Sequence, residues 1–172
     1  MASGFPITIN GTVVKTSEAL YQSLRFPNYP EIQKRIISDS SPISAKRYGR
    51  TQIYKTRKDW NFIRFKIMKF CIEVKMFQNY SAFSKTLLST NDIPIVEYTD
   101  KDKVWGAVLD GKYYTGTNAL GRLLMGLREQ VKEKKFELTI PQIQGITFLG
   151  EDIRLEHLQS FIEPSKQGSI FE

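Results

Sequence analysis

The sequence predicts an α+β domain that is predominantly helical. Between Trp60 and Phe77, hydrophobic residues recur at spacings of three, four and seven, which is the period of a buried helical stripe. Short extended segments with Asn-Gly or Asp-Gly between or after them are typical of small β-hairpins. A length of 172 residues suits one domain with a proper core. We therefore expect a single compact domain over residues 1–172.

Local signals place the individual elements. Asn10-Gly11 predicts the turn of a hairpin over 7–14, and Thr16 or Ser17 is expected to cap a helix that runs to about Arg25. Asp59 is expected to cap the long helix, with Trp60 as its core anchor. The remaining expected elements are helices over 31–37, 43–49, 81–88, 118–132 and near 155–161, strands over 93–98 and 104–108, and a hairpin that turns at Asp110-Gly111.

Composition excludes several classes of protein. Apolar residues make up 41% and charged residues 25%, as in ordinary globular proteins. No apolar run approaches the roughly 18 residues of a membrane span, and the N-terminus lacks a signal-peptide pattern. One cysteine, Cys71, and one histidine, His157, make a disulfide framework or a conventional zinc site unexpected. We therefore expect a cytoplasmic protein without membrane, metal or cofactor, in which carboxylates and lysines are the available catalytic groups.

The charge of the chain favours anionic partners. The formal net charge is +7, and the pI is near 9.4. Between Lys46 and Lys75 there are ten basic residues but only two acids, Asp59 and Glu73. Such a surplus is expected of a surface that faces phosphorylated metabolites, ADP-ribose or nucleic acid. The alternative is a solvated lysine-rich surface, which requires no ligand.

Two polar patterns in the first third of the chain are candidates for a site. Glu18, Gln22 and Arg25 follow one another at i, i+4 and i+7, so they share one stripe of the first helix. In the segment 44–50, Lys46 and Arg50 with Arg47 place three cations beside a glycine, a composition that suits phosphate or pyrophosphate. A solvated polar face and a solvated basic loop are the respective alternatives.

A third candidate lies later in the chain. Asp102 and Trp105-Gly106 place a carboxylate and an indole at the boundary of an expected strand, where the glycine would let a ligand approach. Residues 116–118 offer a polar helix N-terminus that could receive an anion or hydroxyl. The alternatives are a turn aspartate with a core tryptophan, and simple capping by Asn118.

Eight blocks of sequence share an order and spacing that is more specific than any block alone. They are Glu18-Ala19-Leu20-Tyr21-Gln22 with Arg25-Phe26, then Ala45-Lys46-Arg47-Tyr48-Gly49-Arg50, then Arg57-Lys58-Asp59-Trp60 with Arg64 and Met68, then Val74-Lys75-Met76-Phe77-Gln78-Asn79, then Leu87-Leu88 with Thr90, then Val96-Glu97, then Asp102 with Trp105-Gly106, then residues 116–125 with Arg128. Together they resemble the NADAR superfamily over about residues 5–132, in the branch with Ala19 and Arg25. Residues 133–172 are expected as a C-terminal extension packed on the domain.

The resemblance implies an enzyme that hydrolyses N-glycosidic bonds. Substrates of the family are early riboflavin intermediates, in which ribose phosphate is joined to a pyrimidine amine, and ADP-ribose attached to guanine bases. In the second role such an enzyme reverses the action of an ADP-ribosyltransferase, sometimes as the antitoxin of that toxin. We expect removal of ADP-ribose from guanine in nucleic acid. The alternatives are cleavage of phosphorylated riboflavin intermediates and a non-catalytic sensor of ADP-ribose or NAD derivatives.

The resemblance also assigns roles. Cleavage of a ribose C1′–N bond passes through an oxocarbenium-like state, which needs a carboxylate and an acid for the leaving nitrogen. Glu18 and Asp102 are the carboxylates at matched positions, and Lys46 could act as acid, as a nucleophile that forms a Schiff base, or with Arg50 as a phosphate ligand. Trp105 would stack on the base. The other substrate-binding residues expected are Gln22, Arg25, Gly106 and Asn118.

Overall fold

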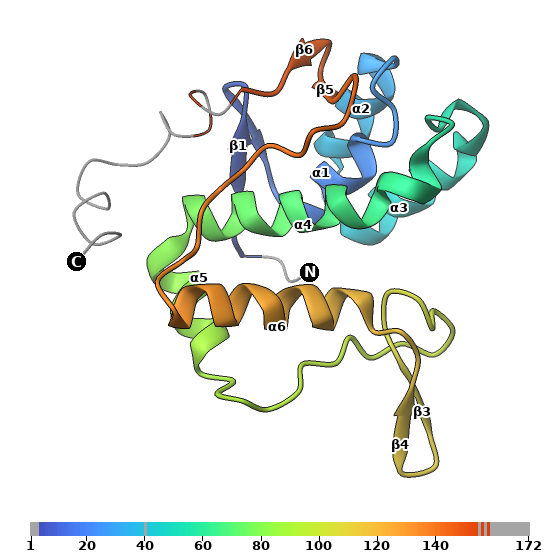
Figure 1. Cartoon of the computed structure of the whole chain (residues 1–172). Coiled ribbons are helices and arrows are strands. Elements are labelled where there is room, and N and C mark those ends of the chain that lie inside the picture. Colours follow the sequence, from blue (N-terminus) through green and yellow to red (C-terminus); the bar gives the residue numbers. More distant parts are fainter. Residues whose placement is uncertain (1–3, 40, 155, 157, 159–172) are drawn as a thin grey trace. The chain divides into compact units, whose positions relative to one another are not determined.

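The structure is a computed structural model that describes residues 4–39, 41–154, 156 and 158 (Figure 1). About 48% of the described residues are helix and 12% are strand, which confirms the predicted helix-rich α+β class. The described strands form three separate two-stranded antiparallel sheets. The chain divides into two compact units, residues 1–80 with 138–172 and residues 81–137. The single domain expected over 1–172 stays a prediction.

The first unit opens with the predicted hairpin of β1 (Ile7–Ile9) and β2 (Thr12–Val14). Asn10 and Gly11 have φ values of 46° and 73°, which is the backbone of a tight two-residue hairpin turn. Helix α1 (Ser17–Ser23) then begins where predicted, because the Thr16 hydroxyl accepts a hydrogen bond from the Ala19 amide at 3.1 Å.

Four helices build the core of this unit. Helix α1 contacts α2 (Pro30–Ser38), α3 (Pro42–Thr51) and α4 (Trp60–Gln78), and α4 runs beside β1 in Figure 1. Both α2 and α3 begin with proline, which cannot donate a backbone hydrogen bond and is pre-set for a first helical turn. The short 3-10 helix η1 (Ile53–Lys55) follows α3. A buried cluster of Phe26, Ile32, Ile36 and Ala45 joins α2 and α3 to the end of α1.

The start of α4 departs from its predicted capping. Asp59 precedes the helix but makes no side-chain capping bond. Its carboxylate instead accepts two hydrogen bonds from Arg57, at 2.7 and 3.0 Å, and this arrangement lowers the pKa of the carboxyl group. The same guanidinium donates to the carbonyls of Gln144 and Gly145. Bidentate pairing with an arginine is a stronger interaction than a neutral cap. The Asp59 carboxylate therefore pairs with Arg57 and does not cap α4.

The described part of the chain after Glu137 belongs to the first unit. The strands β5 (Thr147–Phe148) and β6 (Glu151–Asp152) form a short hairpin, in which Phe148 is fully buried. The Gln33 side chain of α2 donates to the Thr147 carbonyl at 3.0 Å and accepts from the Leu149 amide at 2.6 Å. Most of the helix expected near 155–161, including His157, lies outside the described residues.

The second unit begins at Ser81, one residue after the start of α5 (Tyr80–Leu88). It also contains the hairpin of β3 (Val108–Asp110) and β4 (Tyr113–Thr115), and helix α6 (Ala119–Lys132). The hairpin after Asp110 is confirmed. The strands predicted over 93–98 and 104–108 are wrong, because the described backbone there forms only an isolated bridge between Tyr98 and Ala107 and the first residue of β3.

Side chains of α6 explain the missing strand over 93–98. Arg128 donates to the Ile93 carbonyl at 2.9 Å. Asn118 donates to the Ile95 carbonyl at 2.8 Å and accepts from the Glu97 amide at 3.0 Å. Backbone N–H and C=O groups that bond to side chains do not need a partner strand. The apolar residues of this segment therefore fit a strand pattern although no strand forms. No described helix combines the length and apolar character needed to cross a bilayer.

Lys75 on α4 makes the stability of the first unit depend on pH. Its side chain is buried, and Nζ lies 4.7 Å from the centroid of the Phe5 ring. Burial lowers the pKa of this amine to about 8, from an ordinary value of 10.5. Between these values the unfolded chain holds the proton that the folded protein has lost, so the Lys75 contribution to stability rises with pH there and is constant below pH 8.

Replacement of Lys75 by methionine is therefore expected to remove this rise and to stabilise the protein at neutral pH. The measurement is the free energy of unfolding in urea, followed from about pH 7 to pH 10.5 for the parent and for Lys75→Met. The difference between the two proteins should shrink as the pH rises through 8. A difference that does not change over this range would show that Lys75 is charged in the folded protein throughout.

Candidate active site

The polar stripe of α1 forms a continuous chain of hydrogen bonds. Gln22 donates from Nε2 to Glu18 Oε1 at 2.8 Å, and its Oε1 accepts from Arg25 Nη1 at 3.0 Å. Arg25 Nη2 donates to the Thr56 hydroxyl at 3.2 Å, just after η1. Each donor meets an acceptor, so the amide of Gln22 has only one orientation that satisfies both neighbours. The carboxylate of Glu18 is thereby held in a defined position.

This stripe is not the solvated polar face that its spacing alone would allow. Gln22 is only 3% exposed, and the Glu18 and Arg25 residues are half-buried. Leu20 and Leu24 are fully buried, as predicted. The stripe therefore lies largely inside the first unit, where hydrogen bonds are electrostatically stronger than they are in water.

Neutral, buried groups surround the carboxylate. Burial raises the pKa of the Tyr21 hydroxyl and of the Cys71 thiol, and the negative charge of Glu18 raises both further. Arg25 and Arg64 act on Tyr21 in the opposite direction. Tyr21 and Cys71 are consequently uncharged at neutral pH. The surroundings of the α1 stripe therefore include a neutral tyrosine and a neutral thiol that both sense the charge of Glu18.

Arg25 occupies an aromatic setting. Its guanidinium carbon lies 5.5 Å from the centroid of the Phe26 ring and 5.6 Å from that of Trp60. Trp60 also packs against Tyr21, with ring centroids 5.0 Å apart. The Nε atom of Arg25 is buried and has no hydrogen-bond partner within the described part of the chain. Such an arrangement holds the guanidinium rigidly and leaves it donor capacity.

A second arginine lies close enough to act on the first. Burial lowers the pKa of Arg25, and the positive charge of Arg50 on α3 lowers it further. Over residues 4–39, 41–154, 156 and 158, no carboxylate lies within ion-pair distance of either guanidinium. Tyr21 and Glu18 act on Arg25 in the opposite direction, but the two like charges still repel each other. An anion that contacts both groups would relieve this repulsion, so the pair suits phosphate.

Helix α3 approaches the stripe through its glycine. A Cβ atom on Gly49 would lie 3.5 Å from Gln22 Oε1, so α3 packs directly against the polar stripe of α1. Lys46, Arg47 and Arg50 are all exposed on this helix. The structure brings Arg50 within electrostatic range of Arg25, but it shows no hydrogen bond from Lys46 to the stripe. The role of Lys46 stays a prediction.

Sequence reasoning missed four side chains of this site: Tyr21, Thr56, Trp60 and Arg64. Trp60 was expected only as a core anchor, and it is buried as predicted, but it also packs on Arg25. Tyr21 and Arg64 lie within the first and third of the eight sequence blocks, so their place beside Gln22 and Trp60 was a signal that could have found them. Thr56 carried no signal, because its contact to Arg25 joins residues 31 positions apart.

In the second unit, Asp102 shapes a turn. Its Oδ1 accepts hydrogen bonds from the Val104 amide at 3.1 Å and the Trp105 amide at 3.0 Å. The carbonyls of residues 103–106 then accept from the amides of Thr117, Asn118, Ala119 and Leu120 at the start of α6. These amides are the donors that a helix N-terminus leaves unpaired, so the anion-binding N-terminus expected at 116–118 is wrong: the protein's own turn occupies it.

Two further residues of this unit, Gly106 and Asn118, make structural contacts. A Cβ atom on Gly106 would lie 2.2 Å from the Glu97 carbonyl oxygen, so protein backbone makes the close approach that was expected of a ligand. Asn118, at φ 50°, makes no capping bond, which corrects the simpler alternative, and both ends of its amide are bonded to residues 95–97. Trp105 is half-buried. Substrate contact by Asp102, Trp105, Gly106 and Asn118 stays a prediction.

Comparisons with known proteins agree with the sequence resemblance. The NADAR domain family matches residues 2–132. The chain is 35% identical to N-glycosidase YbiA of Escherichia coli (strain K12) over 135 residues, which are 77% of this chain and 80% of that protein. It is 34% identical to the Riboflavin biosynthesis protein VVA0006 of Vibrio vulnificus (strain YJ016) over 77% of this chain, but it spans only 35% of that protein.

The fold agrees as well. The NMR structure of the E. coli protein YbiA matches with a TM-score of 0.63 and 33% sequence identity, over 80% of this chain and 79% of that chain. A family match over residues 2–132 covers most of the chain. It includes the α1 stripe, α3 and the third candidate at Asp102 and Trp105-Gly106. The chain therefore belongs to the NADAR domain family, and it is an N-glycosidase.

Proposed function

We propose that the protein hydrolyses the bond between ADP-ribose and a guanine base of nucleic acid. The observation that carries this proposal is the half-buried Arg25 guanidinium, which Gln22 joins to Glu18 by hydrogen bonds and on which the charge of Arg50 also acts. In the described part of the chain no carboxylate lies within ion-pair distance of either guanidinium. A pyrophosphate carries two negative phosphates and matches two cations. The carboxylate of Glu18 lies on the same stripe, one relay residue away.

The chemistry follows from that arrangement. As the ribose C1–N bond breaks, its electrons leave with the base nitrogen and positive charge develops on the ribose. The Glu18 carboxylate stabilises that charge or takes a proton from the attacking water. Water adds its oxygen to C1, and the base nitrogen gains a proton. Lys46 remains the predicted source of that proton.

Gln22 is proposed as a positioning residue for this carboxylate, because its two hydrogen bonds hold Glu18 and Arg25 together. Gln22→Leu keeps a similar volume and removes both bonds. We expect kcat to fall on the order of tenfold or more, with a smaller change in KM, since the carboxylate remains but loses its orientation. The matched control is Gln142→Leu, at an exposed position. Equal kcat values for Gln22→Leu and the parent would remove Gln22 from the mechanism.

A second candidate substrate is a phosphorylated riboflavin intermediate. The Vibrio vulnificus relative, which is named a riboflavin biosynthesis protein, favours it. Such a metabolite has the same kind of ribose–nitrogen bond but carries only one phosphate, for which Arg50 with Lys46 or Arg25 would suffice. The two candidates differ in how much positive charge they need outside the site.

Salt dependence separates the candidates. Purified protein is assayed with an ADP-ribosylated guanine oligonucleotide, with the corresponding free nucleoside and with a ribosylamine phosphate of the riboflavin pathway. We expect turnover of the oligonucleotide to exceed that of the nucleoside at low salt, and to fall steeply towards physiological salt. Equal rates on oligonucleotide and nucleoside without a salt slope, or turnover of the ribosylamine phosphate alone, would contradict the nucleic-acid substrate.

A further inference from the structure

Large apolar side chains are exposed around η1. Tyr54 on η1 is 75% exposed, and Phe62 in the first turn of α4 is 85% exposed. Ile43 on α3 and Ile53 on η1 are exposed as well. Single exposed apolar residues are common on proteins. Four within 20 residues, two of them aromatic, are a more unusual concentration. We call the side chains of Ile43, Arg47, Tyr54, Lys58 and Phe62 the η1 surface.

The same stretch of chain is strongly basic. Residues 40–58 contain six lysines and arginines and no acid. Arg47 and Lys58 are exposed, and neither forms an ion pair within the described residues. By contrast, Arg57 of the same stretch is paired with Asp59, and Lys69 of α4 is paired with Glu73. The positive charges of Arg47 and Lys58 are therefore available to an external anion.

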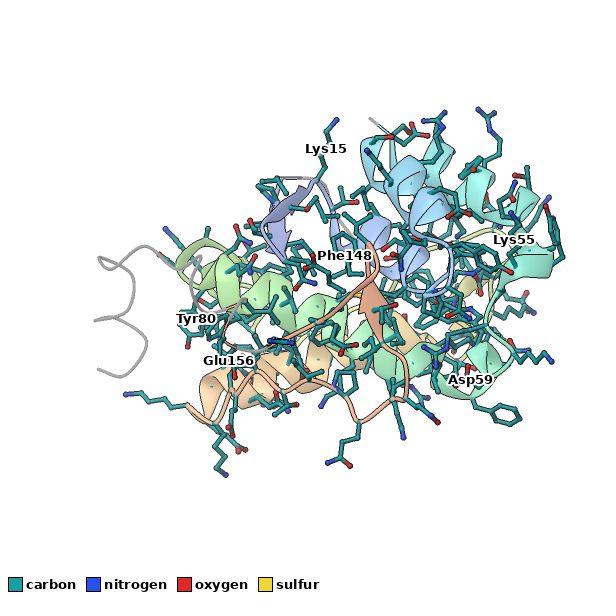
Figure 2. The ribbon with its side chains drawn as sticks, turned by 90° about the horizontal axis from the view of Figure 1, so that it is seen from above. Lys15, Lys55, Asp59, Tyr80, Phe148 and Glu156 are labelled. Carbon is teal, nitrogen blue, oxygen red and sulfur yellow. The ribbon has the colours of Figure 1, made fainter. Side chains whose placement is uncertain are left out.

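The structure also orders one aromatic ring of this surface. Lys55 Nζ lies 5.0 Å from the centroid of Tyr29 and 5.8 Å from that of Tyr54, so the ammonium group lies near both rings. The Tyr54 hydroxyl donates to Gln52 at 3.4 Å. In Figure 2, Lys55 and Asp59 lie on the same side of this unit, and Lys15 lies apart from both. Tyr54 is thus an exposed ring beside the Lys55 ammonium group.

From these contacts we infer that the η1 surface binds a single strand of nucleic acid, with bases stacked on Tyr54 and Phe62 and phosphates on Arg47 and Lys58. Exposed aromatic rings interleaved with cations are the means by which proteins hold unpaired strands, because a ring stacks on any base and the cations follow the backbone. An acidic peptide would use the cations but has no bases to stack on the rings. This inference rests on the proposed function and extends it to the strand that flanks the modified guanine.

Direct binding tests the surface without any turnover. The probe is a fluorescein-labelled, unmodified oligodeoxynucleotide of about 12 nucleotides, within the site sizes known for single-strand binding folds. Its anisotropy is measured with the full-length protein at low salt. We expect Tyr54→Ala with Phe62→Ala to weaken binding on the order of tenfold. Arg47→Ala with Lys58→Ala is expected to reduce the slope of log Kd against log salt concentration by about one to two.

The matched control is Val13→Ala with Lys15→Ala, which removes an exposed apolar side chain and an exposed cation from the β1–β2 hairpin and its end. It should bind like the parent. Equal binding by the aromatic double variant, or an equal loss in the control, would overturn the inference. So would a dependence on Tyr54 and Phe62 that appears with anionic vesicles or an acidic peptide but not with the strand.

Turnover separates this inference from the proposed function. The Tyr54→Ala, Phe62→Ala variant should raise KM for the ADP-ribosylated oligonucleotide and leave hydrolysis of the free ADP-ribosylated nucleoside unchanged. If the parent protein cleaves neither compound, the proposed function fails, and the anisotropy result decides the η1 surface by itself. If the parent cleaves both and the variant changes neither KM, the surface fails and the function stands.

Discussion

Glu18→Gln is expected to lower the rate of glycosidic-bond hydrolysis by about 100-fold or more while the protein remains folded. The substitution keeps the shape of the side chain, and an amide can still accept the hydrogen bond from Gln22 that Glu18 accepts at 2.8 Å. What it removes is the negative charge opposite the developing oxocarbenium ion. The loss should therefore appear in kcat, because the interaction strengthens only in the transition state.

A matched control exists on the next helix. Glu31 also lies in the first turn of a helix, α2, but it is exposed. Glu31→Gln should leave the rate near that of the parent, which separates the role of Glu18 from a general effect of charge at a helix N-terminus. Circular dichroism and thermal unfolding check that both variants are folded. A folded Glu18→Gln protein with turnover close to the parent would refute the assignment of Glu18.

Gly106→Ala is expected to destabilise the second unit strongly. The added Cβ atom would lie 2.2 Å from the Glu97 carbonyl oxygen and 2.7 Å from the Thr99 methyl carbon. Backbone cannot move aside as a flexible side chain can, and the Gly106 amide and carbonyl are both hydrogen-bonded, to Asp102 and Asn118. Overpacking of this kind costs about 3 kcal/mol or more in the free energy of unfolding.

The comparison for this prediction is Gly126→Ala in the middle of α6, where a new Cβ would meet nothing within 4 Å. Alanine favours helix over glycine by up to about 1 kcal/mol, so that variant should be equally stable or more stable. Urea unfolding of the parent and the two variants measures both effects. Unchanged stability in Gly106→Ala would show that the close contact to residue 97 is absent in solution, and would restore the expectation that this glycine makes room for a ligand.

Helical periodicity explains why half of the candidate site was predictable. The spacing of Glu18, Gln22 and Arg25 places them on one stripe in any helix, and the structure joins them by hydrogen bonds. The same spacing does not reveal whether the stripe faces solvent. That depends on α3 and α4 packing around it, through contacts such as those of Gly49 and Trp60. Such contacts join residues far apart in the chain, which one sequence does not pair.

The segment over 93–107 shows the opposite limit. Its apolar residues fit a strand pattern, but its backbone groups are taken up by Asn118 and Arg128 and by the start of α6. A strand pattern reports only which side chains are apolar, whereas a strand requires a partner for its backbone. In the same segment Asp102 forms a turn and Gly106 packs against the backbone of Glu97. The sequence predicted a ligand beside both residues.

Product analysis of an ADP-ribosylated guanine oligonucleotide tests the central claim most directly. After incubation with the purified protein, mass spectrometry of the strand and of the released small molecule identifies the bond that was cut. We expect an unmodified guanine strand and free ADP-ribose in equal amounts, and we expect Glu18→Gln to form both about 100-fold more slowly. A strand that retains phosphoribose on its base would show cleavage of the pyrophosphate, and an unaltered strand would show no reaction. Either result would contradict the proposal that this protein hydrolyses the bond between ADP-ribose and guanine.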